Sequence, residues 1–326
     1  MYIGAIDIGG TKTITAVIDE TGNILHKEQF PTVEKKCDRH LEQCAQSLLS
    51  ILEHLHISAA DLTGVGVTLP GIVDNKSGLL IHAPYENWSQ VPVADLLSKK
   101  LGSLKVFCEN DVNACAVGEQ YFGIGGKYKN YVWMTVSTGV GGAVVNEGKL
   151  VRGEDGYAGE FGHLKVEYEN PEPCPCGQYG CLEAHGSGTA LNREIHKKAE
   201  EDEVFSAAFL KEGHSINAAG CASLARGGNK SAIRIFERTG EYLGRGIAYC
   251  INILNPQTVI IGGGVSASLD LLLPGIRTVI KSSAFKEMQD IEIIATPLGY
   301  EAALLGAAAL VLQNRDKYTD TPKCQD

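Results

Sequence analysis

The sequence has no long hydrophobic run. Hydrophobic residues make up 44% of its 326 positions, yet no window approaches the roughly 18 consecutive apolar residues of a membrane helix. The first ten residues have neither the basic start nor the long apolar stretch of a signal peptide, and they lead directly into an apolar strand pattern. These absences exclude a membrane protein and predict a cytoplasmic one.

Basic residues and disulfide-forming patterns are also scarce. The chain has 29 Lys and Arg against 39 Asp and Glu, a net charge of −10, and no stretch gathers the basic residues into a patch. Nucleic-acid binding depends on neutralising phosphates with Lys and Arg, so this class of function is excluded. Ten cysteines are far below the density of a disulfide scaffold. In a reducing compartment they are expected to be thiols or metal ligands.

The chain is long enough for more than one hydrophobic core. At roughly 150 residues per domain, its length predicts about two domains with a cleft between them. Apolar patterns predict strands over 2–6, 14–18, 24–30, 65–69, 105–108, 131–136, 143–145 and 258–261, and helices over 38–56, 93–101, 114–120, 231–253 and 301–313. Strands that alternate with helices predict an α/β fold. In the long helix, Gly240, Gly244 and Ala248 form a small-residue ridge that would let another element pack closely.

One pattern of strand, glycine turn and strand occurs twice. Residues 2–6 lead into Asp-Ile-Gly-Gly-Thr-Lys at 7–12, and residues 131–136 lead into Ser-Thr-Gly-Val-Gly-Gly at 137–142. A single glycine hairpin is more often only a turn. Two duplicated turns that face each other across a cleft favour phosphate binding, because glycine lets backbone N–H groups approach an anion closely. Gly262–Gly264 adds a third loop at a strand end, where nucleotides commonly bind.

A cluster of metal-ligand residue types lies in a stretch that lacks hydrophobic periodicity. Residues 153–190 are rich in Gly, Pro and Cys, so something other than an apolar core must order them. The set His163, Cys174, Cys176 and Cys181 offers one imidazole and three thiols, which suits a closed, structural Zn²⁺ site. His185 is a competing candidate for the fourth ligand.

Polar residues at strand ends and beside the thiols are candidates for substrate binding. Asn110 and Asp111 follow a predicted strand, where they could orient a ligand hydroxyl or simply cap a helix, and the sequence leaves both interpretations open. Glu160 and Glu183 flank the proposed metal ligands, and rigidly held carboxylates suit hydrogen bonding to a polyol. Solvated glutamates are the ordinary alternative.

Taken together, the motifs resemble the ROK family of sugar kinases, within the hexokinase and actin-like ATPase superfamily. The resemblance follows the family's order over nearly the whole chain. The motifs are DIGGTK at 7–12, PG at 70–71, END at 109–111, STGVGGAVV at 137–145, GEFGH at 159–163, CPCGQYGCLE at 174–183, LNP at 254–256 and GGGV at 262–265. Residues 82–88 loosely resemble the family's segment before the catalytic base.

The resemblance implies a role for each matching residue. Asp111 would be the general base. The sugar contacts would be Gly71, Asn110, Asp111, Glu160, His163 and Glu183. The ATP and phosphate contacts would be Asp7, Gly9, Gly10, Thr11, Lys12, Thr138, Gly139, Gly263 and Gly264, with Asp7 also a candidate magnesium ligand. The cofactors would be structural Zn²⁺ on His163, Cys174, Cys176 and Cys181, and Mg²⁺ with ATP.

The resemblance also implies a fold and an activity. We expect two actin-like, ribonuclease H-like domains, the first formed by 1–117 with about 302–316 and the second by 118–301, with a zinc loop at 159–185 and a frayed tail at 317–326.

The expected reaction is ATP-dependent phosphorylation of a hexose, most simply glucose to glucose 6-phosphate. N-acetylmannosamine, N-acetylglucosamine, allose or a β-glucoside are alternative acceptors. A sugar-responsive regulator is the alternative class, which we disfavour because the first strand begins at residue 2 without a preceding helix-turn-helix. A homodimer or homotetramer is expected.

Overall fold

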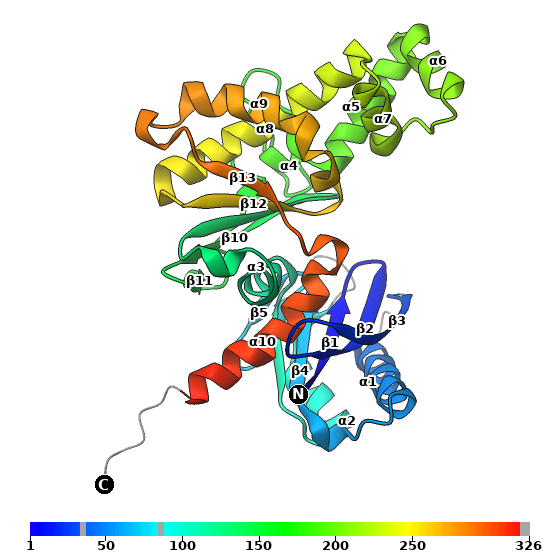
Figure 1. The fold of residues 1–326 in the computed structure, drawn as a ribbon, viewed down its shortest axis with the longest axis vertical. Coiled ribbons are helices and arrows are strands. Elements are labelled where there is room, and N and C mark those ends of the chain that lie inside the picture. The colour runs from blue at the N-terminus through cyan, green and yellow to red at the C-terminus, as the bar shows by residue number, and fades with distance from the viewer. Residues whose placement is uncertain (33–36, 84–87, 320–326) are drawn as a thin grey trace. The chain divides into compact units, whose positions relative to one another are not determined.

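The computed structural model describes residues 1–32, 37–83 and 88–319. The chain divides into two compact units (Figure 1). Unit 1 contains residues 1–127, 150–158 and those from 297 onward, and unit 2 contains 128–149 and 159–296. The predicted domain boundaries at 117/118 and 301/302 stay a prediction, and most of the predicted frayed tail lies outside the described residues. No helix in the described part of the chain is both long enough and apolar enough to cross a bilayer.

Unit 1 is built on a five-stranded sheet. Its strands are β1 (Tyr2–Ile8), β2 (Lys12–Asp19), β3 (Ile24–Pro31), β4 (Leu62–Leu69) and β8 (Val106–Asn110). They lie in the order β3-β2-β1-β4-β8. The first three strands, all predicted from the sequence, form an antiparallel meander, while β4 and β8 run parallel to β1. The carboxyl ends of β1, β4 and β8 therefore meet at one edge of the sheet, where Asp7 and Asn110 lie.

Helices cover both faces of this sheet. The remaining elements of unit 1 are α1 (Cys37–His54), η1 (Ala59–Asp61), β5 (Ile72–Asp74), β6 (Leu79–His82), β7 (Ser89–Val91), α2 (Val93–Lys100), α3 (Asp111–Phe122), η2 (Gly125–Lys127), η6 (Gly299–Glu301) and α10 (Ala302–Thr319). Ile6 and Ile8 pack with α1 and α2, whereas Ile3 and Ala5 pack with α10. A sheet buried on both faces needs continuous apolar runs instead of alternation, which is the pattern of β1 and β4.

Unit 2 repeats the sheet of unit 1. Its strands are β9 (Tyr131–Val136), β10 (Val140–Asn146), β11 (Lys149–Val151), β12 (Thr258–Gly262) and β13 (Glu292–Ala295). Their order, β11-β10-β9-β12-β13, matches that of unit 1 position by position. As in unit 1, the first two strands are antiparallel, and the fourth and fifth in chain order run parallel to the first. The duplication and the α/β class predicted from the sequence are thus confirmed.

Most helices of unit 2 lie in stretches where no helix was predicted. They are η3 (Phe161–His163), α4 (Leu182–Gly186), α5 (Gly188–Glu201), α6 (Glu203–Lys211), α7 (Ala218–Arg226), α8 (Lys230–Leu254), η4 (Gly264–Ser268), α9 (Leu269–Ser283) and η5 (Lys286–Met288). The long helix α8 was predicted, and it packs lengthwise against α9 (Figure 1).

Glycines allow α8 and α9 to approach each other closely. A Cβ atom on Gly240 would lie 2.2 Å from the backbone oxygen of Leu272, and one on Gly244 would lie 2.9 Å from that of Ile276. From the other side, a Cβ atom on Gly275 would lie 2.0 Å from the oxygen of Glu237. These contacts are far inside van der Waals distance, so the ridge at Gly240 and Gly244 is used for close packing, as predicted.

We predict that Gly240→Ala lowers the free energy of unfolding by about 1–3 kcal/mol, because the added methyl group must push two helix backbones apart. Urea unfolding followed by circular dichroism measures the loss. The control is Gly227→Ala, where a Cβ atom would come no closer than 3.3 Å to its neighbours. Equal stability of the two variants would contradict the packing argument.

Candidate active site and metal centre

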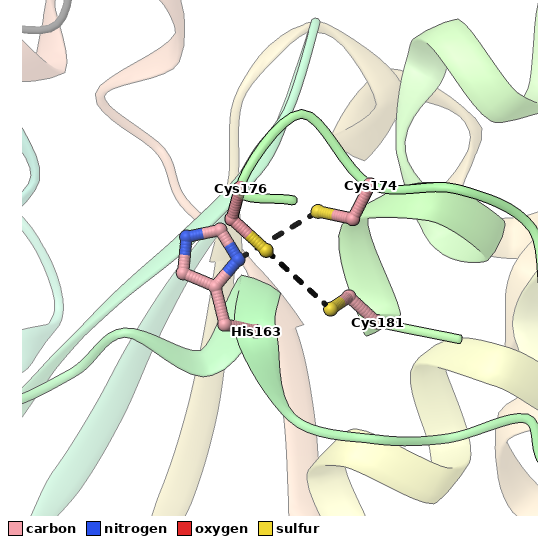
Figure 2. A group of neighbouring side chains, drawn as sticks. All are labelled: His163, Cys174, Cys176 and Cys181. Carbon is pink, nitrogen blue, oxygen red and sulfur yellow. Dashed lines mark hydrogen bonds between the residues drawn. The ribbon is translucent and has the colours of Figure 1, made fainter. Parts of the chain in front are cut away.

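Three thiols and one imidazole converge in the segment before α4. The metal-ligating atoms of His163, Cys174, Cys176 and Cys181 all lie within 4.8 Å of one another. Figure 2 shows the four side chains pointing toward a common centre. Val166 and Leu182 pack into the main apolar core of unit 2, whereas Cys174, Cys181 and Ala184 form only a small cluster of their own. A metal ion on the four-residue set would add order to the part of the segment that the main core does not hold.

The spacing of these atoms fits a tetrahedral metal ion. The Sγ atoms of Cys176 and Cys181 are 3.8 Å apart, and Nδ1 of His163 is 3.8 Å from Sγ of Cys174. With metal–sulfur bonds of about 2.3 Å, two sulfur ligands of a tetrahedral ion lie roughly 3.8 Å apart. The cluster can thus hold a metal ion that accepts thiolate and imidazole ligands. Since Nδ1 of His163 faces the thiols, Nε2 points away and lies 3.7 Å from Glu160 Oε2.

The structure places His185 outside the cluster. The Nε2 atom of His185 accepts a hydrogen bond from the backbone N–H of Glu172 at 3.1 Å. Its ring packs against Tyr242 with a centroid distance of 4.6 Å. Of the two histidines considered from the sequence, His163 is therefore the one that lies with the thiols.

The second glycine turn lies directly against the segment that carries the metal ligands. Oε2 of Glu183, on α4, accepts a hydrogen bond from the backbone N–H of Val140 at 3.0 Å. A Cβ atom on Gly139 would lie 2.2 Å from this same oxygen. Two residues after Val140 on β10, a Cβ atom on Gly142 would lie 2.0 Å from the ring of Phe161. Glycine is needed here so that Glu183 and the segment 159–163 can approach the turn.

The third glycine loop lies at the same edge of the sheet as the second. Gly263 has a φ of +82°, and a Cβ atom on it would lie 2.4 Å from the backbone oxygen of Val136, the residue before the second turn. Thr138 and Gly139 therefore lie near Gly263 and Gly264 at the carboxyl ends of β9 and β12. The carbonyl oxygens of Ser137 and Thr138 accept hydrogen bonds from the start of α5, at 2.7 and 2.8 Å.

In unit 1, Asn110 combines the two roles that the sequence left open. Its Oδ1 accepts hydrogen bonds from the N–H groups of Val112 and Asn113, each at 3.0 Å, so it caps α3. Its Nδ2 donates to the backbone oxygen of Gly71 at 3.0 Å and to Oδ1 of Asp111 at 3.1 Å. The capping residue therefore also ties the Pro-Gly turn and the Asp111 carboxylate together.

Two half-buried carboxylates interact at this edge of the unit 1 sheet. Burial and, to a lesser degree, the nearby Asp7 carboxylate raise the pKa of Asp111 from 3.8 to about 6. Burial also raises the pKa of Asp7, although a hydrogen bond from the Thr68 hydroxyl, at 2.7 Å, opposes this shift. A carboxyl group whose pKa lies near 6 is poised to accept a proton near neutral pH.

The first glycine turn lies at the same edge, between β1 and β2. The N–H of Gly9 donates to the backbone oxygen of Lys12 at 3.0 Å, which closes the hairpin. Gly10, Thr11 and Lys12 are exposed beyond it. The positive charge of Lys12 favours the ionised form of Asp7 and so opposes the rise in its pKa.

Two residues that position the unit 1 part of the site were not predicted from the sequence. Thr68 is fully buried and holds Asp7 through its hydroxyl group. Glu109, 1% exposed, accepts hydrogen bonds from the Asn110 N–H at 3.0 Å and from the Arg152 guanidinium at 2.7 Å. The END motif contained the signal for Glu109, because a carboxylate in a buried strand requires a partner. Nothing in the local sequence distinguishes Thr68.

The structure therefore brings the predicted site residues together in two groups. Asp7, the first glycine turn, Gly71, Asn110 and Asp111 lie in unit 1. The second group, in unit 2, consists of Thr138, Gly139, Glu160, His163, Cys174, Cys176, Cys181, Glu183, Gly263 and Gly264. In the loosely matching segment 82–88, residues 84–87 lie outside the described part of the chain.

We predict that Cys176→Ser lowers the bound metal from one ion per chain to well below one, because a hydroxyl group is a far weaker ligand than a thiolate. Elemental analysis of the purified protein measures the stoichiometry, and trypsin digestion of segment 159–185 measures its order. Cys37→Ser, outside the cluster, should leave both unchanged. Equal metal content in the two variants would refute the assignment.

The pKa of Asp111 also predicts a pH-dependent effect on stability. The pKa of Asp111 is 3.8 in the unfolded chain and about 6 in the folded protein, so the unfolded chain loses this proton first as the pH rises. Ionisation of Asp111 therefore lowers the free energy of unfolding progressively between pH 3.8 and about pH 6, and the loss is complete above that pH. Asp111→Asn should therefore raise the Tm at pH 8 by about 2–5 °C, and the gain should vanish at pH 4. Differential scanning calorimetry checks this. Asp74→Asn is the control: hydrogen bonds lower the pKa of Asp74, so no gain is expected. A gain for Asp111→Asn that is independent of pH would contradict the argument.

Comparisons with known proteins connect this arrangement to one family. A glucokinase of Thermotoga maritima is 35% identical to this chain over 312 residues, which are 94% of this chain and 96% of that protein. A solved ROK family glucokinase from Streptomyces griseus, in complex with glucose and AMPPNP, superposes with a TM-score of 0.81 at 31% identity, covering 96% of this chain and 100% of that one. This likeness confirms the predicted actin-like fold.

A second group of relatives consists of regulators. A xylose repressor of Caldicellulosiruptor bescii is 32% identical over 257 residues, which are 78% of this chain and 63% of that protein. This chain is thus similar both to kinases and to repressors. Residues 3–314 match the model of the ROK family. Since that match spans nearly the whole chain, this protein belongs to the ROK family.

Proposed function

We propose that this protein is an ATP-dependent sugar kinase that phosphorylates glucose to glucose 6-phosphate. The observation that carries the proposal is Asp111, a half-buried carboxylate held at a strand end by Asn110, with a pKa raised to about 6. Glucokinases related to this chain over 94% of its length support the same activity.

Most of the groups that would bind the sugar are held by hydrogen bonds within their own unit. In unit 1 these are Gly71 and Asn110, which are hydrogen-bonded to each other. In unit 2, Glu183 is fixed by the Val140 N–H, while Glu160 and Nε2 of His163 lie 3.7 Å apart. Rigid carboxylates and amides suit a polyol because little conformational entropy is lost when its hydroxyl groups bind.

The nucleotide phosphates would be bound by backbone N–H groups of the glycine turns. The first turn would contribute Gly9, Gly10 and Thr11 with the Lys12 ammonium group, and the second Thr138 and Gly139. Gly263 and Gly264 would lie on the nucleoside side. Asp7 is suited to hold Mg²⁺ directly or through water, since Thr68 orients its carboxylate. When bound, Mg²⁺ neutralises charge on the phosphate oxygens.

Phosphoryl transfer requires mainly alignment and charge neutralisation from a protein. Asp111 would accept a hydrogen bond from the attacking sugar hydroxyl and take its proton as the new P–O bond forms. The Asn110 amide keeps the Asp111 carboxylate in place. Because the ionised form is the base, kcat/KM should fall as the pH drops below about 6.

The metal centre would be structural Zn²⁺ on His163, Cys174, Cys176 and Cys181. Three thiolates and one imidazole complete a tetrahedral zinc shell and leave no position for substrate. His163 would bind the ion through Nδ1 and leave Nε2 free for the sugar. Metal loading and sugar binding would then depend on the same side chain.

A sugar-responsive regulator is the second candidate, favoured by the 32% identity to a xylose repressor. Such a protein would bind the sugar without transferring phosphate to it. The two functions therefore differ in turnover, not in ligand binding.

The test is ADP release from Mg-ATP by the zinc-loaded protein with glucose, mannose, allose, fructose, N-acetylglucosamine, N-acetylmannosamine and a β-glucoside. We expect glucose to give the highest kcat/KM. Asp111→Asn should lower kcat at least about a hundredfold with little change in glucose affinity, because it removes the base and keeps the hydrogen-bonding shape.

Asp74, whose carboxylate accepts hydrogen bonds from Lys76 and Ser77 within its own turn, is the matched control. Asp74→Asn should keep normal turnover. Glucose binding without turnover by the wild-type protein would replace the kinase with the regulator. Highest turnover on another sugar would keep the kinase and change its substrate.

A further inference from the structure

Unit 2 contains a solvent-open cavity of about 830 Å³ that none of the proposed roles uses. It is formed by α4, α5, the first half of α8 and the segment that leads to Cys174. Its volume lies in the range of small-molecule sites in proteins. No residue of the glycine turns or of the metal cluster lines it.

The cavity is cationic although the chain is acidic. Its walls carry six basic side chains, namely Arg193, Lys197, Lys198, Lys230, Arg234 and Arg238, against three carboxylates, namely Glu172, Glu194 and Glu201. The whole chain has a net charge of −10. A concave surface of opposite sign to the rest of the molecule concentrates anions from solution.

Part of this basic charge has no ionic partner. Arg193, Lys198 and Arg234 form ion pairs with Glu194, Asp202 and Glu241 at 3.7, 3.0 and 2.8 Å. Among the described residues, Lys197 and Lys230 form no ion pair within 4.0 Å. Among the same residues, Arg238 also forms no ion pair within 4.0 Å; its guanidinium donates a long hydrogen bond, 3.5 Å, to the Tyr242 hydroxyl and lies 6.0 Å from the centre of that ring. Three cationic groups are thus available to a ligand.

The buried wall of the cavity offers aromatic and polar surface. His185, 6% exposed, and Tyr242, 8% exposed, pack ring to ring beneath the basic side chains. Thr239, 3% exposed, lies one helical turn before Tyr242. Basic groups around the rim and rings at the base suit a small organic molecule that carries phosphate groups, because guanidinium and ammonium groups form charge-assisted hydrogen bonds with phosphate.

The short helix α4 joins this cavity to the proposed active site. It begins after the metal ligand Cys181, its Glu183 contacts the second glycine turn, and its His185 lines the cavity. The Arg193 guanidinium of the cavity donates to the backbone oxygen of Ala184 at 3.0 Å, in the middle of α4. A ligand that draws Arg193 toward itself would act on the element that positions Glu183.

We propose that this cavity is a regulatory site for a small phosphate-bearing anion, coupled through α4 to sugar binding. The binding step is independent of the reaction catalysed, whereas the coupling rests on the proposed sugar site. By thermodynamic reciprocity, the anion changes the affinity for sugar by the same factor as sugar changes the affinity for the anion.

The test of binding is calorimetric titration of the zinc-loaded full chain with inorganic pyrophosphate and with glucose 6-phosphate, each with and without saturating Mg-AMPPNP. The variant replaces Lys197, Lys230 and Arg238 with Gln. We expect it to bind at least about tenfold more weakly than the wild type, because three charge-assisted contacts are lost.

The matched control replaces Lys211, Lys281 and Lys286 with Gln, which removes the same charge from exposed positions of unit 2 outside the cavity. It should bind like the wild type. Equal weakening of anion binding in both triple variants would show a general effect of charge and would overturn the site. Anion binding that disappears when Mg-AMPPNP is present would place the anion at the nucleotide site and would also overturn it. Stronger binding of glucose 6-phosphate than of pyrophosphate would identify a sugar phosphate as the ligand class, and the reverse order would indicate recognition of phosphate alone.

The coupling is tested by titrating glucose with and without the anion that bound, using calorimetry so that no turnover is needed. We expect a change of threefold or more in the glucose Kd, absent in the cavity triple variant. An unchanged Kd would overturn the regulatory role and leave the anion site standing. Absence of glucose binding in any sample would instead count against the proposed function.

Discussion

Four side chains that converge on one point tie together the segment from Gly159 to the end of α4. Val166 and Leu182 pack this stretch into the unit 2 core, but the thiols themselves form only a small apolar cluster with Ala184. The imidazole and thiol atoms lie within 4.8 Å of one another and are arranged so that one metal ion could join them. On either side of this cluster, η3 packs onto Gly142 and α4 brings Glu183 to Val140. The residues that contact the second glycine turn are therefore the chain neighbours of the metal cluster.

The duplicated sheet explains why the polar groups gather where they do. Strands β1, β4 and β8 are parallel in unit 1, and β9, β12 and β13 are parallel in unit 2. The carboxyl ends of the three strands therefore meet at one edge of each sheet. In unit 1 this edge holds Asp7 and Asp111, and in unit 2 it holds the second and third glycine turns. Fully buried strands end there, and the first atoms beyond them are free to contact ligands.

Local patterns were sufficient to predict much of this arrangement. Apolar runs located β9 within the same residues that the structure shows, and the glycine ridge of α8 predicted its close partner. The spacing of His163 and the three thiols predicted the cluster. These features share one property, which is that the residues responsible lie near one another in sequence or repeat with a fixed period.

The features that sequence analysis missed depend on contacts between distant residues. Thr68 acts on Asp7 across 61 positions, and Arg152 reaches Glu109 across 43. The cationic cavity combines helices α5 and α8, and no helix was predicted over the residues of α5. No local property of a threonine in a buried strand, or of a lysine on a helix, distinguishes such positions from ordinary ones. Only the folded chain does.

The path of the chain through the two units also bears on how the protein is made. The core of unit 1 includes Leu304, Ala307 and Val311 of α10, which pack on Ile3 and Ala5 of β1. All of unit 2 lies before residue 297 and is therefore translated before this helix. Domains usually fold in the order of synthesis. Here unit 1 begins first and is completed last, because its helix α10 is translated after unit 2. During synthesis, the face of β1 that α10 covers therefore stays exposed until residues 304–311 have left the ribosome.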